Sequence, residues 1–167
     1  MGIQPIYKNA KTIREDKQMT EKLKGCMMHT HDNWATPKNL YEKLIKQGFR
    51  YPCELNADYN GLEINYFNEK IFINPPFSKM TNWVDYAIKQ YKHNKIVLLL
   101  IPARTDTKYF HKLLKEKPMI IFIEGRLHYN ESKNGAPFPT ILIALSNFNI
   151  IPTYTNMTLE QLENWIK

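Results

Sequence analysis

Cysteines, long apolar runs and a hydrophobic leader are scarce or absent in this sequence. Only Cys26 and Cys53 stand among 167 residues, which is too few for a disulfide framework and favours a reduced compartment. No apolar run approaches the roughly 20 residues of a membrane span. The N-terminus has no hydrophobic segment typical of a signal peptide. We therefore expect a cytoplasmic protein with no membrane partner.

Metal-ligand pairs and internal repeats are missing as well. Cys26, His29 and His31 lie close together, but zinc needs a full tetrahedral set of ligands and no paired cluster accompanies them. We therefore predict no metal site. No repeat or low-complexity run divides the chain, so its length indicates a single domain with a substantial core.

The charge balance favours a polyanionic partner. The sequence has 23 Lys and Arg against 16 Asp and Glu, a formal charge of +7, while 43% hydrophobic residues argue against wholesale disorder. Residues 1–27 are basic and have little apolar periodicity. We interpret them as an N-terminal extension and residues 28–167 as the folded domain. The extension is either an arm that lies on phosphates or a solvated tail.

The segment with the strongest candidates for catalytic residues begins with a short apolar run. Ile71–Ile73 predicts a buried strand, and Pro75 and Pro76 must end it because neither has an N–H for a ladder. The resulting stiff loop lies at the carboxyl end of a strand, where ligands bind in open α/β sheets. There the Asn74 side-chain oxygen and the Pro75 carbonyl can accept hydrogen bonds from the amino group of a nucleobase, and Phe77 offers a flat face for an extruded base. The alternative is a proline-rich loop with a capping Asn and a core Phe.

Several segments of the chain resemble a known family. Asn74-Pro75-Pro76-Phe77 is similar to the [D/N]-P-P-[Y/F/W] motif of amino-group methyltransferases that use S-adenosylmethionine. Between about Met28 and Leu145, four more segments resemble the phage-type DNA N6-adenine methyltransferases in their order: Trp34-Ala35-Thr36-Pro37, the run from Val97 to Thr107, Gly125-Arg126-Leu127 and Ala136-Pro137-Phe138-Pro139. The resemblance implies direct methylation of adenine N6 on a flipped base in DNA, in the host cytoplasm if a phage encodes the chain.

The resemblance also implies a role for each matching position. The catalytic motif comprises Asn74, Pro75, Pro76 and Phe77. The S-adenosylmethionine site comprises Trp34, Thr36, Pro37, Asn56, Asp58 and Asn74. The DNA contacts are Ser78, Lys79, Arg104, Arg126 and Lys133. The acidic loop of the family falls on either Asn56 or Asp58, and no G-x-G accompanies it.

The order of elements predicts a three-layer α/β domain with a mostly parallel sheet, similar to the Rossmann-like methyltransferase fold. Further strands are indicated at Lys95–Ile101, Met119–Ile123 and Thr140–Leu145, the last pairing back antiparallel, and within Tyr51–Asn60. Apolar residues from Trp83 to Tyr91 recur at helical spacing and predict a core helix. Residues 130–139 indicate an exposed loop of the kind that carries binding residues.

Helix ends are predicted from capping residues. Thr36 is expected to cap a helix that starts at Pro37, and Asp106 to cap the helix after the strand Lys95–Ile101. Thr158 and Gln161 form a capping box. The inward faces are expected to hold Leu40, Leu44 and Ile45 in the first helix, and Leu159, Leu162, Trp165 and Ile166 in the last.

The sequence leaves other functions open. The same motif suits amino-group methylation of RNA or of a protein glutamine. A different class is a non-catalytic nucleic-acid-binding module that has lost its cofactor, and a purely structural protein is a third. The chain leaves little room for a separate target-recognition domain, so either sequence specificity is modest or a second subunit, as in a homodimer, contributes.

Overall fold

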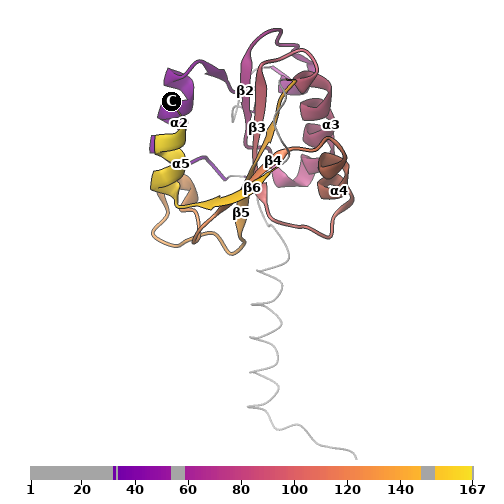
Figure 1. Cartoon of the computed structure of the whole chain (residues 1–167). Helices are drawn as coiled ribbons and strands as arrows, with labels where there is room; N and C mark the ends of the chain where they lie inside the picture. The colour runs from indigo at the N-terminus through magenta and orange to yellow at the C-terminus, as the bar shows by residue number, and fades with distance from the viewer. Residues whose placement is uncertain (1–31, 33, 54–58, 148–152, 167) are drawn as a thin grey trace, which may run out of the picture. The chain divides into compact units, whose positions relative to one another are not determined.

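The computed structural model describes residues 32, 34–53, 59–147 and 153–166, all within one compact unit that begins at Asp32. Six strands of this part form one sheet in the order β1-β2-β3-β5-β4-β6 (Figure 1). The strands are β1 (Phe49–Arg50), β2 (Lys70–Ile73), β3 (Ile96–Pro102), β4 (Met119–Ile123), β5 (Thr140–Leu145) and β6 (Tyr154–Met157). The helices are α2 (Lys38–Lys46), α3 (Met80–Tyr91), α4 (Lys108–Lys115) and α5 (Leu159–Trp165), with 3-10 turns η1 (Gly61–Glu63), η2 (Phe77–Lys79) and η3 (Tyr129–Glu131). The predicted extension and the group Cys26, His29 and His31 lie outside the described residues.

The sheet is mostly parallel, as the sequence predicted. β1, β2 and β3 pair in parallel, β4 and β6 pair in parallel, and β5 runs antiparallel to both β3 and β4. The fold is therefore mixed α/β and consistent with a Rossmann-like sheet. Because Ile73 is in register with Leu99 in the parallel β2–β3 pair, the loops after these two strands leave the same edge.

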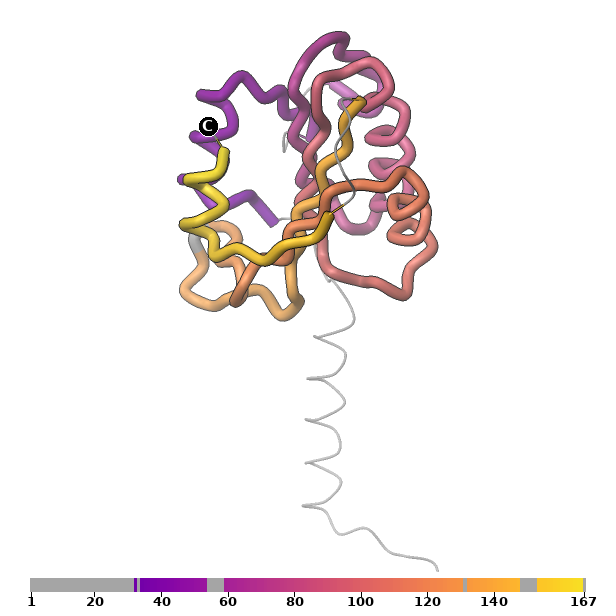
Figure 2. The backbone as a smooth tube through the Cα atoms, in the orientation of Figure 1, coloured from indigo at the N-terminus to yellow at the C-terminus, as the bar shows by residue number. Residues whose placement is uncertain are grey.

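Alternate residues of the central strands enter two separate cores, which explains their continuous apolar sequences. Ile71 and Ile73 pack with α3 and α4 on one face, whereas Phe72 packs with α2 and α5 on the other. Figures 1 and 2 show these two helix pairs on opposite sides of the sheet. Side chains of β2 and β3 point alternately to the two faces, so a strand covered on both needs apolar residues at every position. None of the described helices has the length and apolar character needed to cross a bilayer.

The start of α2 differs from the prediction. Pro37 occupies the N-cap position, and no side chain caps the helix. The Thr36 hydroxyl instead accepts a hydrogen bond from Asn74. Leu40 and Leu44 are fully buried as predicted, but Ile45 is 42% exposed and the prediction for it was wrong. Ile45 follows Leu44 directly, so it lies 100° further around the helix and beyond the buried stripe.

Two further predictions about helices were wrong. α4 starts after Thr107 rather than Asp106, and no side chain caps it because the Thr107 hydroxyl donates to the Arg104 carbonyl at 2.7 Å. Trp165 at the end of α5 is 40% exposed, although Leu162 and Ile166 are buried. None of the described residues of Tyr51–Asn60 belongs to a strand, because β1 ends at Arg50. Residues 54–58 of this range lie outside the described residues.

The capping box at the start of α5 is confirmed and makes a stability prediction. The Thr158 hydroxyl accepts from the Gln161 N–H, and the Gln161 side chain accepts from the Thr158 N–H. Thr158→Ala removes the cap and is expected to lower the free energy of unfolding by about 1 kcal/mol. Urea denaturation measures this loss. Thr153→Ala, at an exposed threonine outside any cap, is the control and should change stability by less than about 0.5 kcal/mol.

Candidate active site

Asn74 sits at the corner where β2 runs into the two prolines. Its side chain is buried, and its Nδ2 donates to the Trp34 carbonyl at 2.6 Å and to the Thr36 Oγ1 at 3.0 Å. These two bonds use both amide hydrogens. The Asn74 Oδ1 is also buried, and none of the described residues donates a hydrogen bond to it. A buried acceptor without a partner is uncommon in folded proteins and calls for an explanation.

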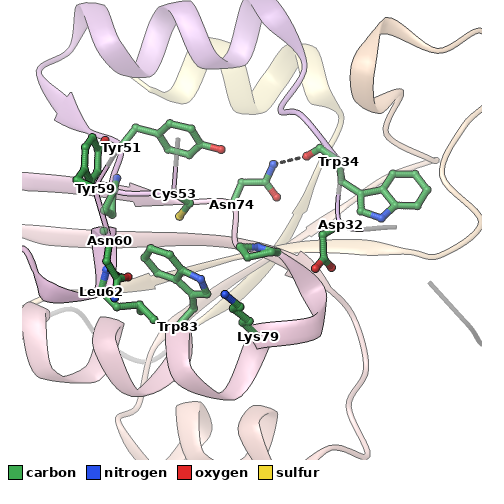
Figure 3. Close-up of a pocket in the computed structure, with 13 residues that line it drawn as sticks. Asp32, Trp34, Tyr51, Cys53, Tyr59, Asn60, Leu62, Asn74, Lys79 and Trp83 are labelled. Carbon is green, nitrogen blue, oxygen red and sulfur yellow. Dashed lines mark hydrogen bonds between the residues drawn. The ribbon is translucent and has the colours of Figure 1, made fainter. Parts of the chain in front are cut away.

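A cavity of about 400 Å³ adjoins this corner (Figure 3). Its described lining comes from the segment before α2, the loop after β1, η1, the diproline corner and the start of α3: Asp32, Trp34, Tyr51, Pro52, Cys53, Tyr59, Asn60, Gly61, Leu62, Asn74, Pro76, Lys79 and Trp83. Pockets of this size, with mostly apolar walls and a few polar groups, are typical of small-molecule sites.

The segment before α2 is fastened to the loop after β2. The Asp32 carboxylate accepts hydrogen bonds from both the backbone N–H of Ser78, at 2.9 Å, and its hydroxyl. The Trp34 ring stacks on Phe77 with 6.2 Å between centroids and 16° between planes. Together with the Asn74 bonds, these contacts hold the two segments as one wall of the cavity.

The loop between β4 and β5 also reaches this wall. Asn130, with φ of +55°, exchanges two hydrogen bonds with the backbone of Ala35: the Ala35 N–H donates to its Oδ1 at 2.6 Å, and its own N–H donates to the Ala35 carbonyl at 3.1 Å. Phe138 packs edge-on against Trp34 and Phe77, at 5.1 and 5.3 Å between centroids. Residues 130–139 are thus not simply an exposed loop, because Phe138 belongs to an aromatic cluster beside the corner.

Comparison with known proteins identifies the family. The family model for DNA N-6-adenine-methyltransferase (Dam) matches residues 54–147, more than half of the chain. This chain belongs to the DNA N-6-adenine-methyltransferase (Dam) family. A DNA N-6-adenine-methyltransferase of Escherichia phage T1 is 26% identical over 110 residues, which cover 58% of this chain and 46% of that protein. The chain thus matches about half the length of this phage relative. The family match confirms the resemblance and includes the Asn74 corner.

In this Dam-family chain the structure brings part of the predicted site together. Trp34, Asn74, Pro76 and Lys79 line the cavity. Thr36 contacts Asn74 and is not among the described residues of the lining. Pro37 and Pro75 are buried and are also absent from the described lining. Asn56 and Asp58 lie outside the described residues, although the chain on either side of them, at Cys53 and Tyr59, lines the cavity.

The predicted DNA contacts divide into three groups. Lys79 is exposed at the cavity, while the Ser78 hydroxyl is engaged by Asp32. Arg104 follows β3 at the same sheet edge as Asn74 but is not among the described lining residues. Arg126 and Lys133 are exposed on the connection between β4 and β5. Their contacts with DNA remain predictions.

Sequence reasoning missed several wall residues of this Dam-family cavity. Asp32 gave no signal, because its partner Ser78 is 46 residues away. Trp83 was assigned to the core, and it is 95% buried while also lining the cavity. Gly61 was not predicted as a site residue, although an isolated glycine can mark close backbone approach.

Cys53 lies in the cavity wall as an unreactive thiol. Burial raises the pKa of the Cys53 thiol far above its ordinary value, despite a hydrogen bond from the Asn74 backbone that lowers it. The thiol therefore stays protonated and is a poor nucleophile, since the thiolate is the reactive form.

Proposed function

We propose that this chain methylates the N6 amino group of adenine in DNA by direct transfer from S-adenosylmethionine to a flipped base. The observation that carries the proposal is the orphaned Asn74 oxygen at the wall of the cavity. An adenine amino group that donates to this oxygen would supply the missing partner. The oxygen is buried, so the base has to displace the side chains that cover it. The family match favours DNA adenine over RNA or protein glutamine.

The chemistry requires a more nucleophilic nitrogen than free adenine has, because the lone pair of the amino group is delocalised into the ring. We propose that Asn74 Oδ1 and the Pro75 carbonyl accept hydrogen bonds from the two amino N–H groups and so favour a pyramidal nitrogen. As the bond from nitrogen to the methyl group forms, the bond from the methyl group to sulfur breaks, and the nitrogen then releases one of its protons. Phe77 is half-buried beside Trp34 and is proposed to stack on the base. Alignment and preorganised dipoles would provide most of the rate, and the protonated Cys53 is consistent with a route without a covalent enzyme intermediate.

The cavity residues fit the methyl donor by chemistry and size. When bound, S-adenosylmethionine supplies an electrophilic methyl group on sulfur. Trp83 and Leu62 offer apolar surface for its adenine, and the exposed ammonium of Lys79 suits its carboxylate. Trp34 contributes to the same wall, and Thr36 and Pro37 follow it closely in the chain. Asn56 and Asp58 remain predicted contacts of the donor.

We propose that DNA lies across the sheet edge that carries Asn74. The formal charge of +7 favours a polyanion, and Arg104 leaves β3 at this edge. Arg126 and Lys133 belong to the connection whose Phe138 packs on Phe77. Helices on both faces of the sheet support the three-layer arrangement of methyltransferases as part of this proposal.

The test is to incubate DNA with labelled S-adenosylmethionine and analyse the nucleosides after digestion. Labelled N6-methyladenine is the expected product. Calorimetric titration with S-adenosylmethionine separates the enzyme from a binding module that has lost its cofactor, because only the enzyme should bind it. Gel shift of DNA at two salt concentrations tests the electrostatic part of binding. Cofactor binding without any modified base in DNA would contradict the proposed substrate.

A further inference from the structure

An asparagine at a catalytic corner has two orientations that differ by a half-turn of its amide. One presents the oxygen to the substrate and the other presents the NH₂ group. Only the oxygen can accept a hydrogen bond from an amino group, because the amide nitrogen is a donor. A methyltransferase that uses Asn74 in this way therefore has to select one orientation.

The neighbours of Asn74 make this selection. The Trp34 carbonyl, 2.6 Å from Nδ2, is an obligate acceptor, so a flipped amide would place two oxygens against each other. Thr36 Oγ1, 3.0 Å from Nδ2, accepts the second amide hydrogen. With both hydrogens engaged, the oxygen is the atom left without a partner among the described groups.

We propose that Thr36 is a positioning residue that, together with the Trp34 carbonyl, fixes the Asn74 amide with its oxygen available to the target amino group. This role rests on the proposed function. It replaces the helix cap and the cofactor contact predicted for Thr36. Thr36 and Asn74 are 38 residues apart in the chain, so the bond connects the segment before α2 to the corner after β2.

The surroundings hold Thr36 firmly enough for this role. On one side, Asp32 is bound to Ser78 by two hydrogen bonds. Ala35, the residue before Thr36, forms hydrogen bonds to Asn130 through both its backbone N–H and its carbonyl. The segment that leads into Thr36 is therefore anchored at two points, which leaves its hydroxyl little freedom to follow a rotating amide.

The test compares Thr36→Val, which keeps the shape and removes the hydroxyl, with Thr36→Ser, which keeps the hydroxyl. Because Val leaves one amide hydrogen without a partner, we expect kcat to fall about 10-fold, with KM for DNA and the dissociation constant of S-adenosylmethionine changed less than about twofold. Thr36→Ser should retain kcat within about threefold. Thr155→Val, on the edge strand β6, is the matched control and should leave all three constants unchanged.

A second measurement does not depend on activity. In protein labelled with ¹⁵N-asparagine, the side-chain NH₂ signal of Asn74 is assigned by its loss in Asn74→Ala. Both its protons should exchange slowly with solvent in the wild type, and at least one should exchange about 10-fold faster in Thr36→Val. If Thr36→Val does not fold, Thr36→Ala takes its place in both measurements.

Three results would overturn the role of Thr36: unchanged kcat in the Val variant, equal losses in the Val and Ser variants, or unchanged amide exchange. Failure of the proposed function has a different signature. If the wild type does not methylate DNA but Asn74 exchange still depends on the Thr36 hydroxyl, the positioning bond stands and the substrate assignment falls.

Discussion

Asn74→Ala is expected to reduce DNA adenine methylation by at least about 100-fold, the usual loss when a group that stabilises the transition state is removed. The side chain supplies the oxygen proposed to accept a hydrogen bond from the amino group, and alanine has no substitute for it. β2 and the diproline corner should persist, because the core residues Ile71–Ile73 are unchanged. Nucleoside analysis after single-turnover reaction measures the methylation rate, and calorimetry should give a dissociation constant for S-adenosylmethionine within about threefold of wild type.

A second variant, Asn74→Asp, tests the hydrogen bond between Asn74 and the Trp34 carbonyl. Aspartate retains an acceptor, and the family motif allows Asp at this position. In this chain, however, an ionised carboxylate would set a second oxygen against the Trp34 carbonyl, where Asn74 now donates at 2.6 Å. We therefore expect Asn74→Asp to lose most activity too. Near-wild-type methylation by the Ala variant would remove Asn74 from its role, whereas activity in the Asp variant alone would contradict only the importance of the Trp34 bond.

Gly61→Ala should distort the part of the cavity wall that η1 and the loop after β1 form. A Cβ at Gly61 would lie 1.8 Å from the Pro52 carbonyl oxygen and 3.1 Å from the Trp83 ring. Because the first neighbour is backbone, either η1 or the loop after β1 has to move, and both line the cavity. We expect a loss of about 1–3 kcal/mol in unfolding free energy. We also expect S-adenosylmethionine to bind about 10-fold more weakly or worse, which corresponds to about 1.4 kcal/mol.

Gly48→Ala is the matched control. Its Cβ would meet no atom within 4 Å, but its φ of +81° is a conformation that alanine disfavours. The variant should therefore lose about 1–2 kcal/mol of stability while binding S-adenosylmethionine as the wild type does. Unchanged cofactor affinity in Gly61→Ala, measured by calorimetry on folded protein, would contradict the placement of the donor in this cavity.

Periodicity and proline predicted the parts of this fold that depend on local sequence. The apolar runs around Ile71–Ile73 and Lys95–Ile101 became strands buried on both faces, and their parallel register places the Asn74 corner and Arg104 at one edge. The corner was predictable because two consecutive prolines admit few backbone shapes. These signals lie within a few residues of the features they specify.

The contacts that complete the site could not be predicted in this way. Thr36 has the sequence signature of an N-cap, yet its hydroxyl serves Asn74, because a tertiary partner competes with the local one. Asp32 and Asn130 bind groups 46 and 95 residues away, respectively. Hydrogen bonds of this kind depend on where separate loops meet at the sheet edge, which neither composition nor spacing encodes.

The antiparallel strand β5 has a consequence for synthesis of the chain. It lies between β3 and β4 in the sheet but follows both of them in sequence. A nascent chain that has emerged only as far as β4 therefore carries two apolar strands whose facing edges lack the strand that will join them. Such edges attract strands of other molecules until β5 is inserted between them. Translational pausing before Thr140–Leu145 emerges should thus favour aggregation, and pausing after it should not.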